Sequence, residues 1–121
     1  MRYFVGLDWA KLTHAVCVIA EDGAIVLRLA VDHTAEGLAR LVTALRRFGD
    51  PADLGIAIER PSGLLVDTLV EAGFVVYPIH PNVVKDSRPR YSAALGKSDP
   101  GDAYLLADLL RVSRQKGRKP A

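Results

Sequence analysis

The chain has 121 residues, of which 50% are hydrophobic and 25% are charged. This length suits one domain with a substantial core and leaves no room for two, and the composition excludes a disordered or fibrous protein. The first residues carry an acid inside their apolar run, unlike a signal peptide, and no apolar stretch approaches the roughly 20 residues that cross a membrane. Cys17 is the single cysteine, so no internal disulfide forms and we expect a cytoplasmic protein.

Charge is divided unevenly along the chain. Residues 85–121 contain nine Lys or Arg and four Asp, a net charge of +5, whereas residues 1–84 contain seven Lys or Arg and ten acids, a net charge of −3. The basic C-terminal third favours an acidic polymer such as nucleic acid as a partner. The alternative is an ordinary solvated surface followed by a disordered tail.

The N-terminal half predicts three strands and one helix. The strands are expected at residues 2–8, 14–20 and 24–31, where β-forming residues are concentrated. A hairpin turn signal, Glu21-Asp22-Gly23, joins the second strand to the third. Thr34 is a favourable N-cap for an amphipathic helix over residues 35–48. Three strands at this spacing predict an antiparallel meander.

The C-terminal half alternates between strands and helices. The expected elements are a buried strand at 54–59, a helix capped by Ser62 and running to about Ala72, a strand at 74–79, a loop with at most one helical turn at 80–97, and a helix at 100–113. Pro78 indicates that the fifth strand lies at an edge of the sheet or is ending there. We expect one domain over residues 1–113, with residues 114–121 as a basic tail or the start of a linker.

This order of elements predicts an α/β fold with a mixed five-stranded sheet. The first three strands are antiparallel, and helices flank the faces of the sheet. The first strand is expected at the centre, between the second and the fourth. In such sheets, sites gather at the carboxyl ends of adjacent parallel strands. Asp8 and Glu59 end the first and fourth strands, so we expect both side chains at one crevice.

Four acids are candidates for a metal site. Asp8 and Glu59 end apolar strands, where a carboxylate is costly unless it is paired or bound to metal. Asp99 and Asp102 lie three residues apart, on one face of the last helix. Taken singly, each acid has an ordinary alternative as a cap, an ion-pair partner or a charge that stabilises the helix start.

Together, these acids predict metal-dependent chemistry. Four converging carboxylates repel one another, and their pKa values rise unless positive charge compensates. Oxygen ligands without Cys or His favour Mg²⁺ or Mn²⁺ over zinc. Two such ions, about 3.5–4 Å apart, can activate the attacking oxygen and stabilise the leaving oxygen in phosphodiester cleavage.

Three motifs carry a resemblance to a known family. They are Gly6-Leu7-Asp8-Trp9-Ala10-Lys11, Glu59-Arg60-Pro61-Ser62-Gly63 and Lys97-Ser98-Asp99-Pro100-Gly101-Asp102-Ala103. Over essentially its whole length the chain resembles the N-terminal, RuvC-like domain of the DEDD-type transposases of bacterial insertion sequences, which has an RNase H-like fold. The resemblance implies that the family's four acids, in the order D, E, D, D, are Asp8, Glu59, Asp99 and Asp102. Trp9-Ala10 and Pro61-Ser62 depart from the family's usual residues without removing an acid.

The resemblance implies more than the residues show. Such transposases cut and rejoin DNA as oligomers, and they are similar to, or are, recombinases guided by a structured bridge RNA. They carry a C-terminal domain with a catalytic serine. Since that domain is absent here, the resemblance implies a fragment or truncated product that does not transpose DNA alone.

Basic and aromatic residues before the last helix are candidates for nucleic-acid contacts. They are Lys85, Arg88, Arg90, Tyr91 and Lys97. The alternative is a solvated loop. His14, His33 and His80 do not cluster in the sequence and are expected at the surface or in turns. Trp9 is either a core anchor or a base-stacking residue, and the core interpretation is favoured.

Three other functions stay open at this point. A Holliday-junction-type nuclease would share the acids and cut four-way junctions on its own. A nucleotide-binding domain of the actin and sugar-kinase type also starts with a Gly-x-Asp strand, but needs a second lobe and a Gly-rich adenosine loop. In a non-catalytic nucleic-acid-binding module, the acids would be caps only.

Overall fold

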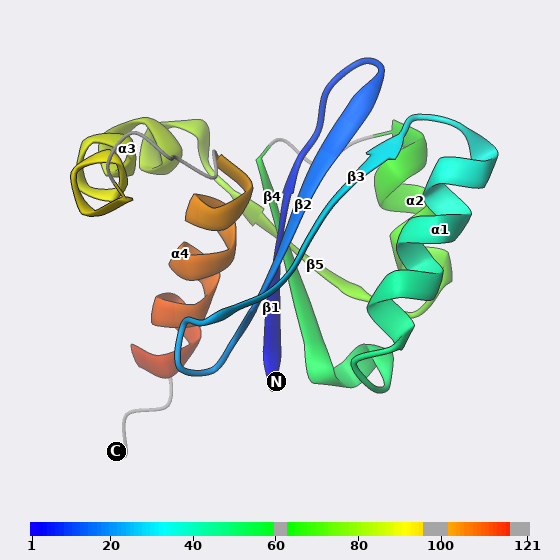
Figure 1. Cartoon of the computed structure of the whole chain (residues 1–121), viewed down its shortest axis with the longest axis horizontal. Coiled ribbons are helices and arrows are strands. Elements are labelled where there is room, and N and C mark those ends of the chain that lie inside the picture. Colours follow the sequence, from blue (N-terminus) through cyan, green and yellow to red (C-terminus); the bar gives the residue numbers. More distant parts are fainter. Residues whose placement is uncertain (60–62, 96–101, 117–121) are drawn as a thin grey trace.

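The computed structural model describes residues 1–59, 63–95 and 102–116. The elements in chain order are β1 (Tyr3–Asp8), β2 (Thr13–Ala20), β3 (Ile25–Asp32), α1 (Ala35–Arg46), the 3-10 turn η1 (Pro51–Asp53), β4 (Leu54–Glu59), α2 (Gly63–Glu71), β5 (Val75–Ile79), α3 (Pro81–Leu95) and α4 (Asp102–Lys116). The strands form one sheet with helices on both sides (Figure 1).

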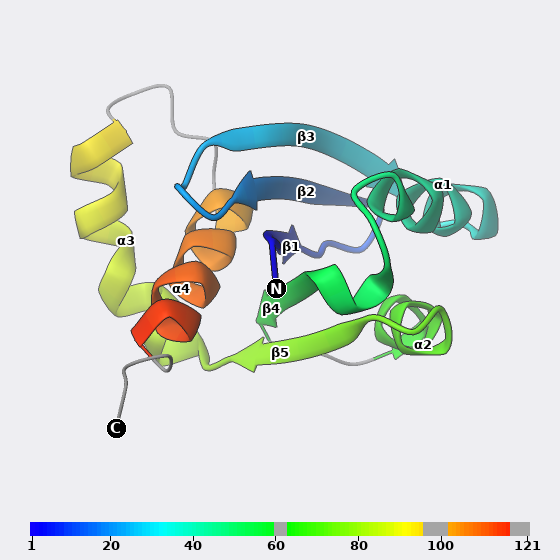
Figure 2. The same ribbon diagram turned by 90° about the horizontal axis from the view of Figure 1, so that it is seen from below.

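The sheet has the order β3-β2-β1-β4-β5. β1 pairs antiparallel with β2, and β2 pairs antiparallel with β3, which makes the meander that the sequence predicts. β1 also pairs in parallel with β4, and β4 with β5, so β1 is central and β5 lies at an edge (Figure 2). The predicted mixed five-stranded sheet, with its first three strands antiparallel, is therefore confirmed.

Each face of the sheet has its own apolar core. Alternate residues of β1 point to opposite faces, so Val5 and Leu7 join the core under α1 and α2, whereas Phe4 joins the core under α4. In the two views, α1 and α2 lie on one side of the sheet, and α4, with α3 beside it, lies on the other (Figures 1 and 2). Among the helices of the described segments, none is long and apolar enough to cross a membrane.

A local signal sets the start of α1, and the ends of the other helices differ from their predicted places or lie outside the described residues. The Thr34 hydroxyl accepts a hydrogen bond from the backbone N–H of Gly37 at 3.0 Å, which confirms the predicted N-cap of α1. This helix ends at Arg46, two residues before the predicted end. The predicted cap of α2, Ser62, lies outside the described residues. α4 continues to Lys116, three residues beyond its predicted end.

The prediction of a loop over residues 80–97 is wrong, because α3 occupies Pro81–Leu95. Pro81 is the first helical residue, where proline is favoured because its missing N–H has no helical partner anyway. The His80 ring accepts the N–H of Asn82 at 3.0 Å and caps the helix start. Pro89 lies inside the helix on its exposed side, while Val84 is buried against α4. The prolines led to the prediction of a loop, whereas packing against α4 stabilises α3.

Candidate active site

Three of the predicted acids lie at one end of the sheet. Asp8 is the last residue of β1, Glu59 is the last residue of β4, and Asp102 is the first residue of α4. Leu7 and Ile58 are paired in the parallel register of β1 and β4, so the two strand-end acids follow neighbouring residues. Asp99 lies outside the described residues. We call Asp8, Glu59 and Asp102 the carboxylate cluster.

The glycine in β1 brings α4 against the sheet. A Cβ at Gly6 would overlap the carbonyl oxygen of Ala103 and lie 2.7 Å from the backbone nitrogen of Ala107, which is too close for any real side chain. The α4 backbone therefore lies directly on the central strand, two residues before Asp8 on the same face. This contact places the first turn of α4, with Asp102, beside the end of β1.

Electrostatics links the three carboxylates. The pKa of Asp8 is raised from its usual value, first by burial, then by the negative charges of Asp102 and Glu59, while Arg88 opposes the rise. Both other acids are therefore close enough to Asp8 to disfavour its ionised form. The arrangement concentrates negative charge that a cation would neutralise.

One cation of the protein itself reaches this cluster. Arg88, on α3, donates to both carboxylate oxygens of Asp102, with Nε–Oδ1 and Nη2–Oδ2 distances of 3.2 and 2.7 Å. The Arg88 side chain is 51% exposed and that of Asp102 25% exposed. Neighbouring Asp102 raises the pKa of Arg88, and the more distant charges of the other two acids add to this rise. Arg88, which the sequence predicts to contact nucleic acid, is therefore paired with Asp102 of the carboxylate cluster within the protein.

A small cleft of about 170 Å³ opens at the cluster, between Leu7, Asp8, Trp9 and Glu59. The indole Nε1 of Trp9 donates to the backbone oxygen of Glu59 at 3.0 Å, which fixes the ring across the ends of β1 and β4. Trp9 is 45% exposed. The interpretation of Trp9 as a core anchor is therefore wrong, because the β1–β2 turn carries the ring out over the sheet end.

The cluster suits hard divalent cations by its donor chemistry. Its side chains offer only carboxylate oxygens, the ligands that Mg²⁺ and Mn²⁺ prefer, and their mutual repulsion is the cost that such a cation removes. Within residues 1–59, 63–95 and 102–116, no three His, Cys, Asp or Glu side chains are arranged so that they could hold a metal ion. Arg88 engages Asp102 instead, and Asp99 is outside those ranges.

The other predicted nucleic-acid contacts divide into two kinds. Lys85 and Arg90 are exposed on α3. Tyr91 is half-buried and donates its hydroxyl to Asp108 at 2.7 Å, and Arg111 donates to the other oxygen of Asp108 at 2.7 Å. This network ties α3 to α4, so Tyr91 has a positioning contact that sequence reasoning missed. Lys97 lies outside the described residues.

A histidine pair was also missed. His14 is 1% exposed, and its Nε2 lies 2.9 Å from Nδ1 of His33. The expectation that these histidines are separate surface or turn residues is wrong for His14. Its position in β2 gave the signal, because it alternates in register with Val16 and Val18, which face the core under α1 and α2. Cys17, by contrast, is buried in the core under α4.

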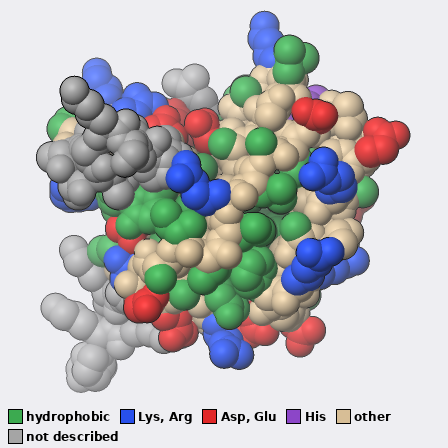
Figure 3. All heavy atoms as spheres, in the orientation of Figure 1, with side chains coloured by type: hydrophobic (Ala, Val, Ile, Leu, Met, Phe, Trp, Pro, Cys, Tyr) green, Lys and Arg blue, Asp and Glu red, His purple; other side chains and the backbone are tan. Residues whose placement is uncertain are grey.

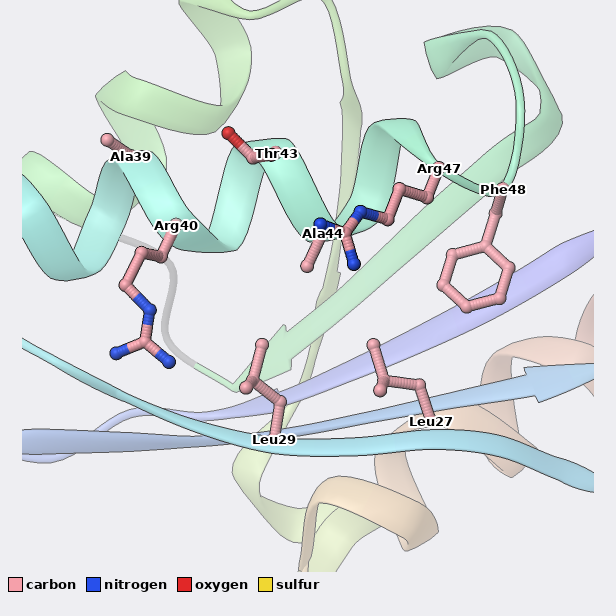
Figure 4. A pocket seen from close by; sticks show the side chains of 8 residues that line it. All are labelled: Leu27, Leu29, Ala39, Arg40, Thr43, Ala44, Arg47 and Phe48. Atoms are coloured by element: carbon pink, nitrogen blue, oxygen red, sulfur yellow. The ribbon is translucent and has the colours of Figure 1, made fainter.

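A further groove of about 530 Å³ lies away from the carboxylate cluster, between β3 and α1. Its floor and rim are formed by Leu27, Leu29, Ala39, Arg40, Thr43, Ala44, Arg47 and Phe48 (Figure 4). Figure 3 shows hydrophobic side chains exposed over β3 and α1 with basic side chains beside them. The groove contains none of the acids, so it is separate from the candidate active site.

The sheet order, with acids at the ends of the two central parallel strands and at the start of the helix that covers them, defines an RNase H-like domain of the RuvC type. The solved structure of Thermus thermophilus RuvC in complex with a Holliday junction substrate has a TM-score of 0.65 to this chain, with 18% identity and complete coverage of both chains. At that identity the likeness concerns the fold. The chain belongs to the DEDD_Tnp_IS110 family, described as transposase, whose sequence profile matches residues 5–120.

Two curated relatives agree with this membership. One, from Streptomyces coelicolor, is provisionally named a mini-circle transposase for IS117 and is 32% identical over 98% of this chain. The other, from Sinorhizobium fredii, is provisionally named transposase y4uE and is 34% identical over 90% of this chain. The matched region makes up 29% and 31% of these relatives, so the chain spans less than a third of their length.

Proposed function

We propose that the chain is the catalytic domain of a DNA transposase or recombinase, which cleaves and transfers DNA phosphodiester bonds with divalent metal ions. Asp8, Glu59, Asp99 and Asp102 are the proposed catalytic residues and metal ligands. The observation that carries the proposal is the convergence of Asp8, Glu59 and Asp102 from three elements on one end of the sheet. Membership in a transposase family and the RuvC-like fold support it.

The cofactor is proposed to be Mg²⁺ or Mn²⁺, held as two ions. When bound, such ions supply a nucleophile at neutral pH and stabilise the leaving oxygen. Within the chain, β1 and β4 hold two acids rigidly at the sheet end, and α4 supplies the third. Arg88 neutralises part of the cluster's charge, and its guanidinium also matches the geometry of a DNA phosphate.

DNA is the proposed substrate, contacted by Lys85, Arg88, Arg90, Tyr91 and Lys97. Lys85 and Arg90 are exposed on α3, beside the helix that carries Asp102. Tyr91 orients this surface through Asp108. The RuvC structure was solved with a Holliday junction, and this supports cleavage of branched DNA as the alternative activity. A guide RNA, a homo-oligomer and a cytoplasmic location remain proposals for the longer proteins of this family.

The domain boundary is a proposal as well. Residues 1–113 form the proposed catalytic domain, and residues 114–121 are the proposed basic tail or start of a linker. We expect the 121-residue chain to bind metal and DNA but not to transpose DNA on its own.

Asp8→Asn tests the proposal. Mn²⁺ binding by calorimetry and Mn²⁺-dependent nicking of supercoiled and four-way-junction DNA should both be seen for the chain and both be lost in the variant. Asp67→Asn, on an exposed position of α2, is the matched control and should leave both intact. Cutting of four-way junctions alone would favour the resolvase alternative. DNA binding without any Mn²⁺ or Mg²⁺ uptake would favour a non-catalytic module and overturn the proposal.

A further inference from the structure

A second hollow lies beside the carboxylate cluster, on the other side of Trp9. It has a volume of about 340 Å³ and is lined by Trp9, Ala10, Lys11, His14, His33, Gly63, Leu64 and Leu65. This volume is within the range of small-ligand sites. Trp9 also lines the cleft of the carboxylate cluster, so one indole ring forms a wall of both. The β1–β2 turn that carries this wall projects from the sheet end (Figure 1).

The histidine pair gives this hollow a defined hydrogen-bond donor. The backbone N–H of Ala10 donates to Nδ1 of His14 at 3.1 Å, so this nitrogen carries no proton. The neutral His14 ring is therefore protonated on Nε2 and donates to Nδ1 of His33. His33 then carries its own proton on Nε2. His14 is 1% exposed, whereas His33 is exposed. The buried His14 ring therefore fixes which nitrogen of the exposed His33 ring carries the proton.

The hollow also has an oriented aromatic surface and exposed apolar neighbours. The bond from Trp9 to the backbone of Glu59 fixes the ring, yet 45% of the residue is exposed. Leu64 at the start of α2 is 57% exposed, and Leu12, next to the lining residue Lys11, is 81% exposed. In the space-filling view, hydrophobic side chains and a basic one stand together over the projecting turn (Figure 3).

We propose that this hollow binds one unpaired nucleobase of the DNA strand whose neighbouring phosphate lies at the carboxylate cluster. The base stacks on Trp9, His33 donates from Nε2 to an acceptor on the base edge, and Lys11 pairs with an adjacent phosphate. This inference rests on the proposed function for the path of the DNA. It adds a binding site for single-stranded DNA formed by residues outside the predicted nucleic-acid contacts.

A nucleobase fits these features better than a protein segment does. A flat aromatic face, a directed donor and a lysine at the rim match the π-face, edge acceptors and phosphate of one nucleotide. Continuity with the acid cleft through the same indole gives the nucleotide a direct path to the cluster. An apolar protein segment would offer no hydrogen-bond acceptor to His33 Nε2 and no negative charge to Lys11.

Trp9 is the only tryptophan of the chain, so its fluorescence reports directly on the hollow. The experiment adds a single-stranded oligodeoxynucleotide of mixed sequence to the 121-residue chain in EDTA, and the same backbone made abasic as the matched probe. We expect the oligonucleotide to quench Trp9 emission and the abasic strand to bind more weakly without quenching. Equal quenching by both strands would overturn the proposal.

Variants read by fluorescence anisotropy of labelled DNA sharpen the test. Trp9→Ala should weaken single-strand binding about 5- to 150-fold, the range for loss of one base stack, whereas Trp9→Phe should retain most affinity. His33→Ala should weaken binding about 2- to 13-fold, as expected for one hydrogen bond. Ile25→Ala, exposed at the opposite end of the sheet, is the control and should change nothing.

The failures of the two proposals are distinguishable. If Trp9→Ala leaves DNA affinity unchanged while Mn²⁺ binding and nicking persist, the base site is wrong and the nuclease function stands. If Trp9→Ala instead alters self-association in sedimentation, the hollow is a protein contact and the base site is likewise wrong. Selective quenching in a chain that neither binds Mn²⁺ nor cuts DNA would support the base site and overturn the nuclease.

Discussion

The two faces of the sheet are built differently. Under α1 and α2 the core is made of large aliphatic side chains and Phe74. Under α4 it contains small residues such as Ala57, Ala103 and Ala107, next to a bare glycine in β1. Polar groups also join α3 to α4 on this second face, through the Arg88–Asp102 ion pair and the Tyr91–Asp108 hydrogen bond. Large side chains fill the core of the first face, whereas small residues on the second face let the backbones of α4 and β1 approach closely.

This difference separates stability from positioning. Large side chains bury the area that drives folding, and they tolerate small shifts of a helix with little chemical consequence. Small residues bury less area but bring the backbone of α4 close to β1, which sets where Asp102 lies relative to Asp8. The face that carries the candidate active site therefore depends on geometry more than on buried area.

The largest expected effect comes from one substitution on each face of the sheet. Leu41→Ala removes a fully buried side chain of α1 and should lower the free energy of unfolding by about 2–5 kcal/mol. Gly6→Ala adds one carbon that collides with the α4 backbone and should cost about 1–3 kcal/mol or more. Urea unfolding measures both.

Metal binding then tells the two faces apart. In conditions where both variants are folded, Leu41→Ala should bind Mn²⁺ like the parent chain, because its cavity lies on the opposite face. Gly6→Ala should bind it at least tenfold more weakly, because α4 and Asp102 are displaced. Unchanged Mn²⁺ affinity in the folded Gly6→Ala chain would contradict the positioning of the site by close packing.

A smaller effect is expected in the polar network of the second face. Tyr91→Phe removes the hydroxyl that donates to Asp108, and a hydrogen bond to a charged group contributes about 1.5–3 kcal/mol. Because Tyr91 is only half-buried and Arg111 still pairs with Asp108, we expect a loss near the low end of that range. Urea unfolding measures it, with Tyr77→Phe as the control. A loss equal to that of the control would show that the bond contributes nothing.

How much the sequence could predict also differs between the faces. The meander and the central position of β1 follow from the spacing of the β-forming runs and the order of elements, and both are confirmed. Placing Asp8 and Glu59 at strand ends required only strand length and alternation. In contrast, α3 was missed because its helical spacing from Val84 to Tyr91 is obscured by Pro81 and Pro89.

Contacts between side chains of different elements were harder to predict from the sequence. The bond between His14 and His33 joins two strands, and the ion pair of Arg88 with Asp102 joins two helices. No local pattern sets which of several basic residues meets a given acid, since that depends on where α3 docks. Gly6 gave only a weak indication of its contact with α4. A glycine inside a strand often marks close approach of another backbone, but it does not identify which backbone.

The smallest expected effect concerns the pH dependence of stability on the face covered by α1 and α2. Burial, and then the charge of His33, lower the pKa of His14 below the ordinary histidine value of about 6.5. The unfolded chain therefore binds a proton that the folded chain refuses, so the contribution of His14 is complete above about pH 6.5 and declines as the pH falls below it. We expect stability to fall by at most about 1.4 kcal/mol per pH unit in this window.

Urea unfolding of the chain between about pH 7.5 and 5.5, compared with His14→Gln, isolates this contribution. The variant should be less stable at the upper pH, because His33 and the Ala10 N–H lose their partner, but its stability should depend less on pH. If His14→Gln retains the full pH dependence, the buried histidine is not its source, and the fixed polarity of the histidine pair loses its support.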